Sequence, residues 1–185
     1  MHELLLKPHP DSGTGAVSGI AAKVARPRAG ALMLSYVVSG RIGDISLPAR
    51  TGAARTDGLW HHTCFEAFVG SASAVAYYEF NFAPSTQWAA YRFSGYRSGM
   101  SEAMETAPPL IEVNSSADGF TLQALLEVDR LSALPRGSLW RLGLSAVIED
   151  KLGHKSYWAL AHPLGKPDFH QADCFSYEFS PMGQA

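Results

Sequence analysis

The side chains best suited to ligand chemistry are concentrated in residues 57–97 of this chain. They supply an indole, two carboxylates, an amide and a guanidinium, from Trp60, Glu66, Glu79, Asn81 and Arg92. Carboxylates and amides exchange hydrogen bonds with hydroxyl groups, and an aromatic ring covers the apolar side of a ring-shaped ligand. These residue types together predict a binding site for a polar ligand.

Three β-strands are predicted to position these residues, over Thr63–Val69, Ala76–Phe82 and Gln87–Phe93. Alternate side chains of a strand share one face of a sheet. The set expected to face the core is Phe65, Ala67, Val69, Tyr78, Phe80, Phe82, Tyr91 and Phe93. The opposite face then carries the polar set together with Cys64, Phe68, Tyr77 and Trp88. That second face is either a ligand surface or a partly solvated one, whose Glu–Arg pairs are worth roughly 0.2–1 kcal/mol each.

A loop near the C-terminus is a second candidate for ligand contacts. It combines Lys166, Asp168 and His170 with an aromatic residue, Phe169. We expect it either to close over the ligand face or to be a solvated loop anchored by Phe169, since functional residues are common in loops. Together with His62, its three titratable residues are possible contributors to the site.

Catalysis is the main alternative to simple binding. Glu66 and Glu79 suit a general acid–base pair, because neighbouring like charges raise one pKa and glycosidases use two carboxylates. His62 and Cys64 suit a Cys–His nucleophile pair. However, the sequence contains no nucleophile elbow, phosphate loop or metalloprotease motif. We therefore assign no catalytic residue, and an enzyme remains the alternative interpretation.

A metal site is a related alternative. Imidazole and thiolate groups that suit zinc or copper occur at His61, His62, Cys64, His162 and His170. Their spacing matches no standard metal motif, no haem attachment motif is present, and no acidic loop has a calcium pattern. We predict no cofactor and assign no metal ligand, while structural calcium or a transition metal is left open.

Composition indicates a globular protein. The chain has 185 residues, 46% hydrophobic and 17% charged, which predicts a single domain over residues 1–185. The net charge is −2 and no long basic run occurs, so nucleic acid is not an expected partner. The oligomeric state is left open, and a protein–protein interaction module is a third possible function.

Location follows from what the sequence lacks. There is no apolar run of 18 residues and no signal-peptide pattern at the N-terminus, so we expect a cytoplasmic protein without membrane contact. In a reducing compartment Cys64 and Cys174 are expected to be free thiols. They can pair only if the fold brings their Cα atoms within about 7 Å.

Strand signals also dominate the rest of the chain. Further strands are predicted over Glu3–Lys7, Ile20–Arg26, Ala31–Ser39, Leu110–Ser115, Phe120–Val128, Leu139–Glu149, Lys155–Leu160 and Cys174–Phe179. Short helical turns are predicted at Ser101–Thr106 and Asp129–Leu134. Many short strands between turn signals, without a long period-3.6 pattern, predict an all-β fold, an antiparallel, jelly-roll-like β-sandwich of two sheets.

Three segments of the central block carry a resemblance to a known family. They are W-x5-E at Trp60–Glu66, Y-x-E-F-N-F at Tyr77–Phe82 and W-x-A-Y at Trp88–Tyr91. With Trp158 and the tail Pro167–Phe179, this order resembles the DOMON-like fold, and within it proteins similar to the family 9 carbohydrate-binding module. The resemblance covers roughly residues 20–180.

The resemblance implies a two-sheet antiparallel sandwich that binds a sugar without catalysis. Trp60 matches a tryptophan that stacks on the sugar in that family, and Glu66 matches the carboxylate residue that follows this tryptophan. Asn81 matches a family Asn. Glu79 stands where the family carries an Arg, which brings two carboxylates to one site. The opposite wall is assigned to Trp158 and His162. The expected partner is a small-molecule or glycan ligand, either a carbohydrate or a sugar-containing metabolite.

Overall fold

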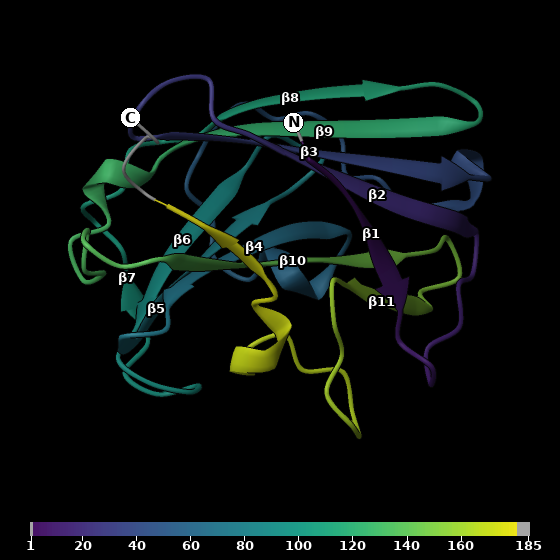
Figure 1. The fold of residues 1–185 in the computed structure, drawn as a ribbon. Helices are drawn as coiled ribbons and strands as arrows, with labels where there is room; N and C mark the ends of the chain where they lie inside the picture. The colour runs from purple at the N-terminus through teal and green to yellow at the C-terminus, as the bar shows by residue number, and fades with distance from the viewer. Residues whose placement is uncertain (1, 181–185) are drawn as a thin grey trace.

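The computed structural model of the protein describes residues 2–180 and consists almost entirely of β-strands (Figure 1). The strands form two layers, called sheet A and sheet B below. Every strand pairs antiparallel with its neighbours. The prediction of an all-β antiparallel sandwich is therefore confirmed.

Sheet A forms one layer, drawn at the top of Figure 1. In spatial order it contains β1 (His2–Pro8), β2 (Val17–Ala25), β3 (Ala31–Gly40), β9 (Gly119–Glu127) and β8 (Leu110–Ser115). Alternating burial along β9 shows that one side of sheet A faces the interior and the other faces outward.

Sheet B forms the second layer and holds the strands with the candidate ligand residues. In spatial order it contains β7 (Ser101–Glu102), β6 (Trp88–Phe93), β5 (Ala74–Phe82), β4 (Cys64–Ser71), β10 (Trp140–Glu149) and β11 (Lys155–Ala159). A short strand, β12 (Tyr177–Phe179), pairs with the start of β10.

Strand β1 belongs to both layers. Its first part pairs with β2, with Leu6 opposite Ile20, and its end pairs with β11, with Lys7 opposite Ala159. Because one strand is hydrogen-bonded to both sheets, it fixes their relative position along this edge.

The main core lies between the two sheets. Phe65 of β4 stacks on Phe120 of β9, with ring centroids 5.7 Å apart, and both side chains are buried. The hydroxyl of Tyr36 in sheet A donates a 2.7 Å hydrogen bond to the backbone carbonyl of Glu66 in sheet B. Apolar packing and this buried hydrogen bond together hold the sheets face to face.

The outer face of sheet B is also covered. The segment after β11 folds back over it and places Phe169 and Phe175 in a second apolar cluster with Phe68 of β4. Gly143 of β10 makes this possible, because a Cβ atom there would lie 2.8 Å from the ring of Phe175. Both faces of sheet B are therefore buried.

The remaining predictions about strands, turns, cysteines and membrane spans can be compared with the structure. Most predicted strands lie within a few residues of observed ones, but the helical turn expected at Asp129–Leu134 is a single 3₁₀ turn over Val128–Arg130. The turn expected at Ser101–Thr106 begins with the short strand β7. Cys64 and Cys174 are both buried free thiols. Within residues 2–180, no helix has the length and apolar character needed to cross a membrane.

Candidate ligand-binding site

A cavity of about 410 Å³ lies on the outer face of sheet B. Its walls come from strands, from the turn before β4 and from the C-terminal segment: Trp60, His61, Glu66, Glu79, Phe93, Arg97, Met100, Val147, Lys155, Tyr157, Pro167, Phe169 and His170. Cavities of roughly 300–1,000 Å³ with apolar walls and a few polar groups are typical of small-ligand sites.

Glu66 and Glu79 form the acidic part of the cavity. They come from adjacent strands and are only 3% and 5% exposed. Ser145 donates a 3.1 Å hydrogen bond to Glu66 Oε2, and Asn81 donates a 2.7 Å hydrogen bond to Glu79 Oε1. One oxygen of each carboxylate is thus held by sheet B, which fixes how both groups face the cavity.

Burial changes the protonation of both carboxylates. Burial and the charge of Glu79 raise the pKa of Glu66 to about 8, against the hydrogen bond from Ser145. Burial raises the pKa of Glu79 to about 7, against the hydrogen bond from Asn81 and the charge of Arg97. Near neutral pH the pair therefore retains a proton and can both donate and accept hydrogen bonds.

His170 links Glu79 to the opposite wall. The hydroxyl of Tyr77 accepts a 3.2 Å hydrogen bond from the backbone N–H of Arg97 and lies 2.8 Å from His170 Nδ1. The other ring nitrogen, Nε2, lies 3.7 Å from Glu79 Oε2. Burial, and then the charge of Arg97, lower the pKa of His170 to about 4, so the imidazole is neutral at pH 7.

Arg97 lines the cavity from the turn after β6. Its backbone has φ of +49°, in the left-handed region that non-glycine residues seldom adopt. Its Nη2 lies 2.8 Å from Oδ1 of Asp168. The same Oδ1 accepts a hydrogen bond from the backbone N–H of His170, and Oδ2 of Asp168 accepts one from the hydroxyl of Tyr96. Asp168 therefore positions Arg97 and the C-terminal segment against each other.

Trp60 forms an aromatic wall. It lies in the 3₁₀ turn Leu59–His61 and packs edge-on against Tyr91, with centroids 5.7 Å apart. The hydroxyl of Tyr91 in turn donates to Asp57. Trp60 is partly exposed, whereas the other three tryptophans are each at most 4% exposed. Trp60 is thus the indole available to a ligand.

Strands β10 and β11 supply the far end of the cavity. Val147 pairs with Tyr157, and both side chains line the cavity. Lys155 lies two residues before Tyr157 on the same face and lines it as well. This end is therefore mixed, with an apolar wall and one ammonium group.

The structure contradicts the predicted position of Arg92. Phe82 pairs with Trp88 and Tyr78 pairs with Arg92, so Arg92 lies on the inner face of sheet B. There its guanidinium approaches Glu105 at 3.9 Å. Directly paired residues share a sheet face, so the predicted alternation was one residue out of phase in this strand.

That phase error has a physical cause. Tyr91 and Phe93 were expected in the main core because they are aromatic, yet they lie on the outer face in the second cluster. Since both faces of sheet B are buried, aromatic character does not distinguish them. Arg97 is the cationic residue that the structure places in the cavity instead of Arg92.

The predicted position of Trp158 is also wrong, because its neighbour Tyr157 lines the cavity instead. It lies in the core between the sheets, 2% exposed, and its indole N–H donates to Ser156. The register pairs Trp158 with Ala146 of the main core, whereas the next pair, Tyr157 and Val147, faces the cavity. Trp158 is therefore not the opposite wall.

Three other predicted residues lie outside the cavity lining. His162 Nε2 is 2.8 Å from the carbonyl of Lys7, and its ring packs edge-on against His9. His62 is exposed and contacts Glu149 at 2.7 Å, so its neighbour His61 lines the cavity instead. Lys166 is exposed as well.

Asn81 and Asp168 do not line the cavity themselves, but each contacts a residue that does. Asn81 is fully buried and fixes Glu79, and Asp168 fixes Arg97. From the predicted loop, Pro167, Phe169 and His170 reach the cavity. The sequence alone had no signal for Arg97, because its place depends on the turn after β6 and on its contact with Asp168.

The His and Cys residues considered for a metal do not converge. Among the residues that the structure describes, no group of three or more His, Cys, Asp or Glu side chains is arranged to hold a metal ion. The Cys64 thiol instead lies 3.7 Å from Oδ1 of Asn81 and is buried. Burial raises its pKa, so the thiolate needed for a Cys–His pair is disfavoured.

Known structures define the class of fold. No protein-family model matches the sequence, and no curated protein matches it significantly. Solved structures do match, and they show that this chain has a fold also found in a candidate carbohydrate-binding protein.

That protein comes from Bacteroides uniformis. The two chains are 15% identical, with a TM-score of 0.70 over 95% of this chain and 84% of the other.

Two structures of a family 9 carbohydrate-binding module from Caldicellulosiruptor kristjanssonii also match. The glucose complex is 12% identical, with a TM-score of 0.47 over 83% of this chain and 72% of the module. The cellotriose complex is 11% identical, with a TM-score of 0.48 over 89% and 74%. The fold assignment rests on the Bacteroides uniformis protein, whose TM-score is higher.

Proposed function

We propose that this protein binds a carbohydrate in the cavity on the outer face of sheet B. One observation carries the proposal: the cavity joins a partly exposed indole to two buried, pre-oriented carboxyl groups. A sugar ring needs both, because its C–H face is apolar and its edge is lined with hydroxyl groups.

The aromatic and the charged residues of the cavity have different roles in this proposal. Trp60, with Phe169 and Tyr157 in the same lining, offers apolar surface to the ring. Glu66 and Glu79 hydrogen-bond to hydroxyls, and Arg97 adds donors. A half-protonated carboxyl pair suits a hydroxyl, which is both a donor and an acceptor.

The fold supports the proposal independently. The Bacteroides protein with the same fold is itself described as a candidate carbohydrate binder, and the two family 9 modules were solved with glucose and cellotriose. Fold does not fix function, so the residues of the cavity carry the argument and the fold adds to it.

The test is a titration with mono- and disaccharides, followed by tryptophan fluorescence and calorimetry. A change in fluorescence on titration reports on Trp60, because the other three tryptophans are buried and do not line the cavity. We expect saturable binding with a dissociation constant between micromolar and millimolar, or about −8 to −4 kcal/mol. If a broad panel of neutral, acidic and amino sugars gives no saturable signal by either method, the proposal is wrong.

A further inference from the structure

Neither acidic side chain of the pair forms a salt bridge with a lysine or arginine in the part of the chain that the structure describes. Glu66 is only 3% exposed, and within residues 2–180 it forms no ion pair. Ser145 bonds one of its oxygens, and no hydrogen bond is found at the other, which belongs to a side chain lining the cavity. Glu79 accepts a hydrogen bond from the neutral amide of Asn81 at one oxygen, and its other oxygen lies 3.7 Å from the neutral imidazole of His170. A buried carboxylate without a counter-charge is unfavourable.

The cations near the cavity do not meet this need. The guanidinium of Arg97 is held by Asp168 at 2.8 Å, which offsets its charge. Lys155 lines the cavity but lies two residues before Tyr157, at the start of β11. Its place in the register is opposite Glu149, two strand steps from Val147. Among the described residues, no lysine or arginine forms a salt bridge with either acidic group, and Arg97 acts on them only from a longer distance.

The walls beside the acidic pair are aromatic. Phe93, Tyr157 and Phe169 line the same cavity as Glu66 and Glu79, with Trp60 at the side. Aromatic faces attract ammonium groups, with estimates of about 0.5–2 kcal/mol per contact. Carboxylates within aromatic walls favour a positively charged nitrogen over a hydroxyl.

We propose that the preferred ligand is an amino sugar, whose protonated amine lies between Glu66 and Glu79 while its ring lies against Trp60. This inference rests on the proposed function and names the class of sugar. The amine supplies the counter-charge that the protein itself does not place there. Arrival of the ammonium favours ionised carboxylates, so binding releases the proton that the pair retains near neutral pH.

The experiment compares glucosamine, glucose and N-acetylglucosamine by calorimetry at pH 6.5. We expect glucosamine to bind at least tenfold more tightly than the other two, because only its nitrogen is charged. Repeating the titration in two buffers of different ionisation enthalpy should show net proton release for glucosamine and none for glucose.

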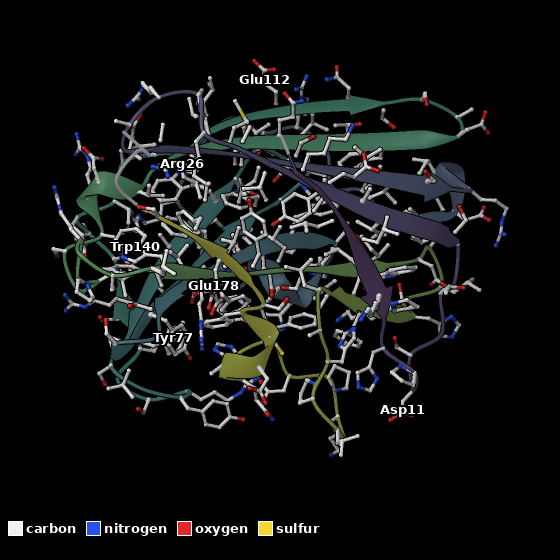
Figure 2. The ribbon with its side chains drawn as sticks, in the orientation of Figure 1. Asp11, Arg26, Tyr77, Glu112, Trp140 and Glu178 are labelled. Carbon is white, nitrogen blue, oxygen red and sulfur yellow. The ribbon has the colours of Figure 1, made fainter. Side chains whose placement is uncertain are left out.

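Glu66→Gln tests the role of the pair, since it keeps the shape and removes the charge. We expect it to reduce the preference for glucosamine over glucose from at least tenfold to less than threefold. The ratio of the two affinities is the readout, because the variant alters the site for both sugars. Glu112→Gln is the matched control, because Glu112 is an exposed residue of β8 on the outer surface of sheet A (Figure 2). This control should keep the full preference for glucosamine.

The outcomes separate the two proposals. If glucose binds as tightly as glucosamine, or if the preference survives Glu66→Gln, the inference is overturned and the sugar function stands. If cyclohexylamine, which has the amine and a ring but no hydroxyls, binds as tightly as glucosamine, the sugar function is overturned. If no sugar binds, both proposals fail.

Discussion

The two faces of sheet B use the same strands for opposite purposes. On the inner face, Phe65, Phe80 and Phe82 pack against sheet A without polar partners for their side chains. On the outer face, two residues within one strand step of them, Glu66 and Glu79, are as deeply buried but carry acidic groups. Figure 2 shows Tyr77 below Trp140, in the half of the view that also holds the C-terminal segment.

This contrast shows that depth of burial does not identify the core of this protein. The inner face is covered by another sheet, whereas the outer face is covered by a segment that contributes its own polar groups, including His170. Unpaired buried carboxylates lower stability, and this cost accords with the binding role that we propose for the outer face. The four predictions below test this division of roles.

The largest effect is expected from Phe80→Ala on the inner face. Phe80 is 1% exposed, so truncation should lower the free energy of unfolding by about 3–5 kcal/mol. Urea denaturation measures this loss, and sugar affinity of the remaining folded protein should be unchanged. A loss of affinity without a loss of stability would contradict the division of roles between the faces.

On the outer face, Glu66→Gln should stabilise the protein at high pH. The folded-state pKa of about 8 lies above the ordinary 4.5, so the folded state holds more protons in that window and wild-type stability falls as pH rises through it. The variant lacks this fall. At about 1.4 kcal/mol per pKa unit, it should exceed the wild type by a few kcal/mol at pH 8 and match it near pH 4.5.

Urea titrations at pH 4.5, 6.5 and 8 measure the effect of Glu66→Gln. Glu112→Gln, on the other sheet, should follow the wild type at all three values. Parallel curves for wild type and Glu66→Gln would contradict the burial of a titrating carboxyl on this face.

Trp60→Ala should separate binding from stability. Trp60 is partly exposed, so we expect the melting temperature to change by only a few degrees. Loss of the aromatic wall should weaken sugar binding at least tenfold, or about 1.4 kcal/mol. Calorimetry measures the affinity, because the fluorescence signal is lost with the indole. Unchanged affinity would remove Trp60 from the site.

The smallest effect is expected from Arg92→Gln. Its 3.9 Å contact with Glu105 is partly exposed, so the loss of stability should be within about 1 kcal/mol and sugar affinity should be unchanged. The matched Arg97→Gln, in the cavity, should weaken binding about fivefold through loss of its donors. Calorimetry on both variants decides which arginine serves the site.

Much of the fold could be predicted from the sequence because strand signals are local. Alternation in β4 and β5 placed Glu66, Glu79 and Asn81 on one face, as the register shows. It failed in β6, where both faces carry aromatic residues, and Arg92 was assigned to the wrong face for that reason. Trp158 was assigned to the site through the family resemblance, and it lies in the core between the sheets.

Long-range contacts explain the rest of the site. Arg97 reaches the cavity because Asp168, 71 positions away, holds its side chain. His170 takes its place through the hydroxyl of Tyr77, 93 positions away. Such pairs leave no periodic trace in the sequence, so only the fold reveals them.

Gly143 gives the cavity a means of adaptation. A side chain there would displace Phe175, and with it the segment that carries Phe169 and His170. The width of the cavity thus depends on a position outside its lining. A substitution behind the wall can therefore change the shape of the cavity while every residue that lines it stays the same.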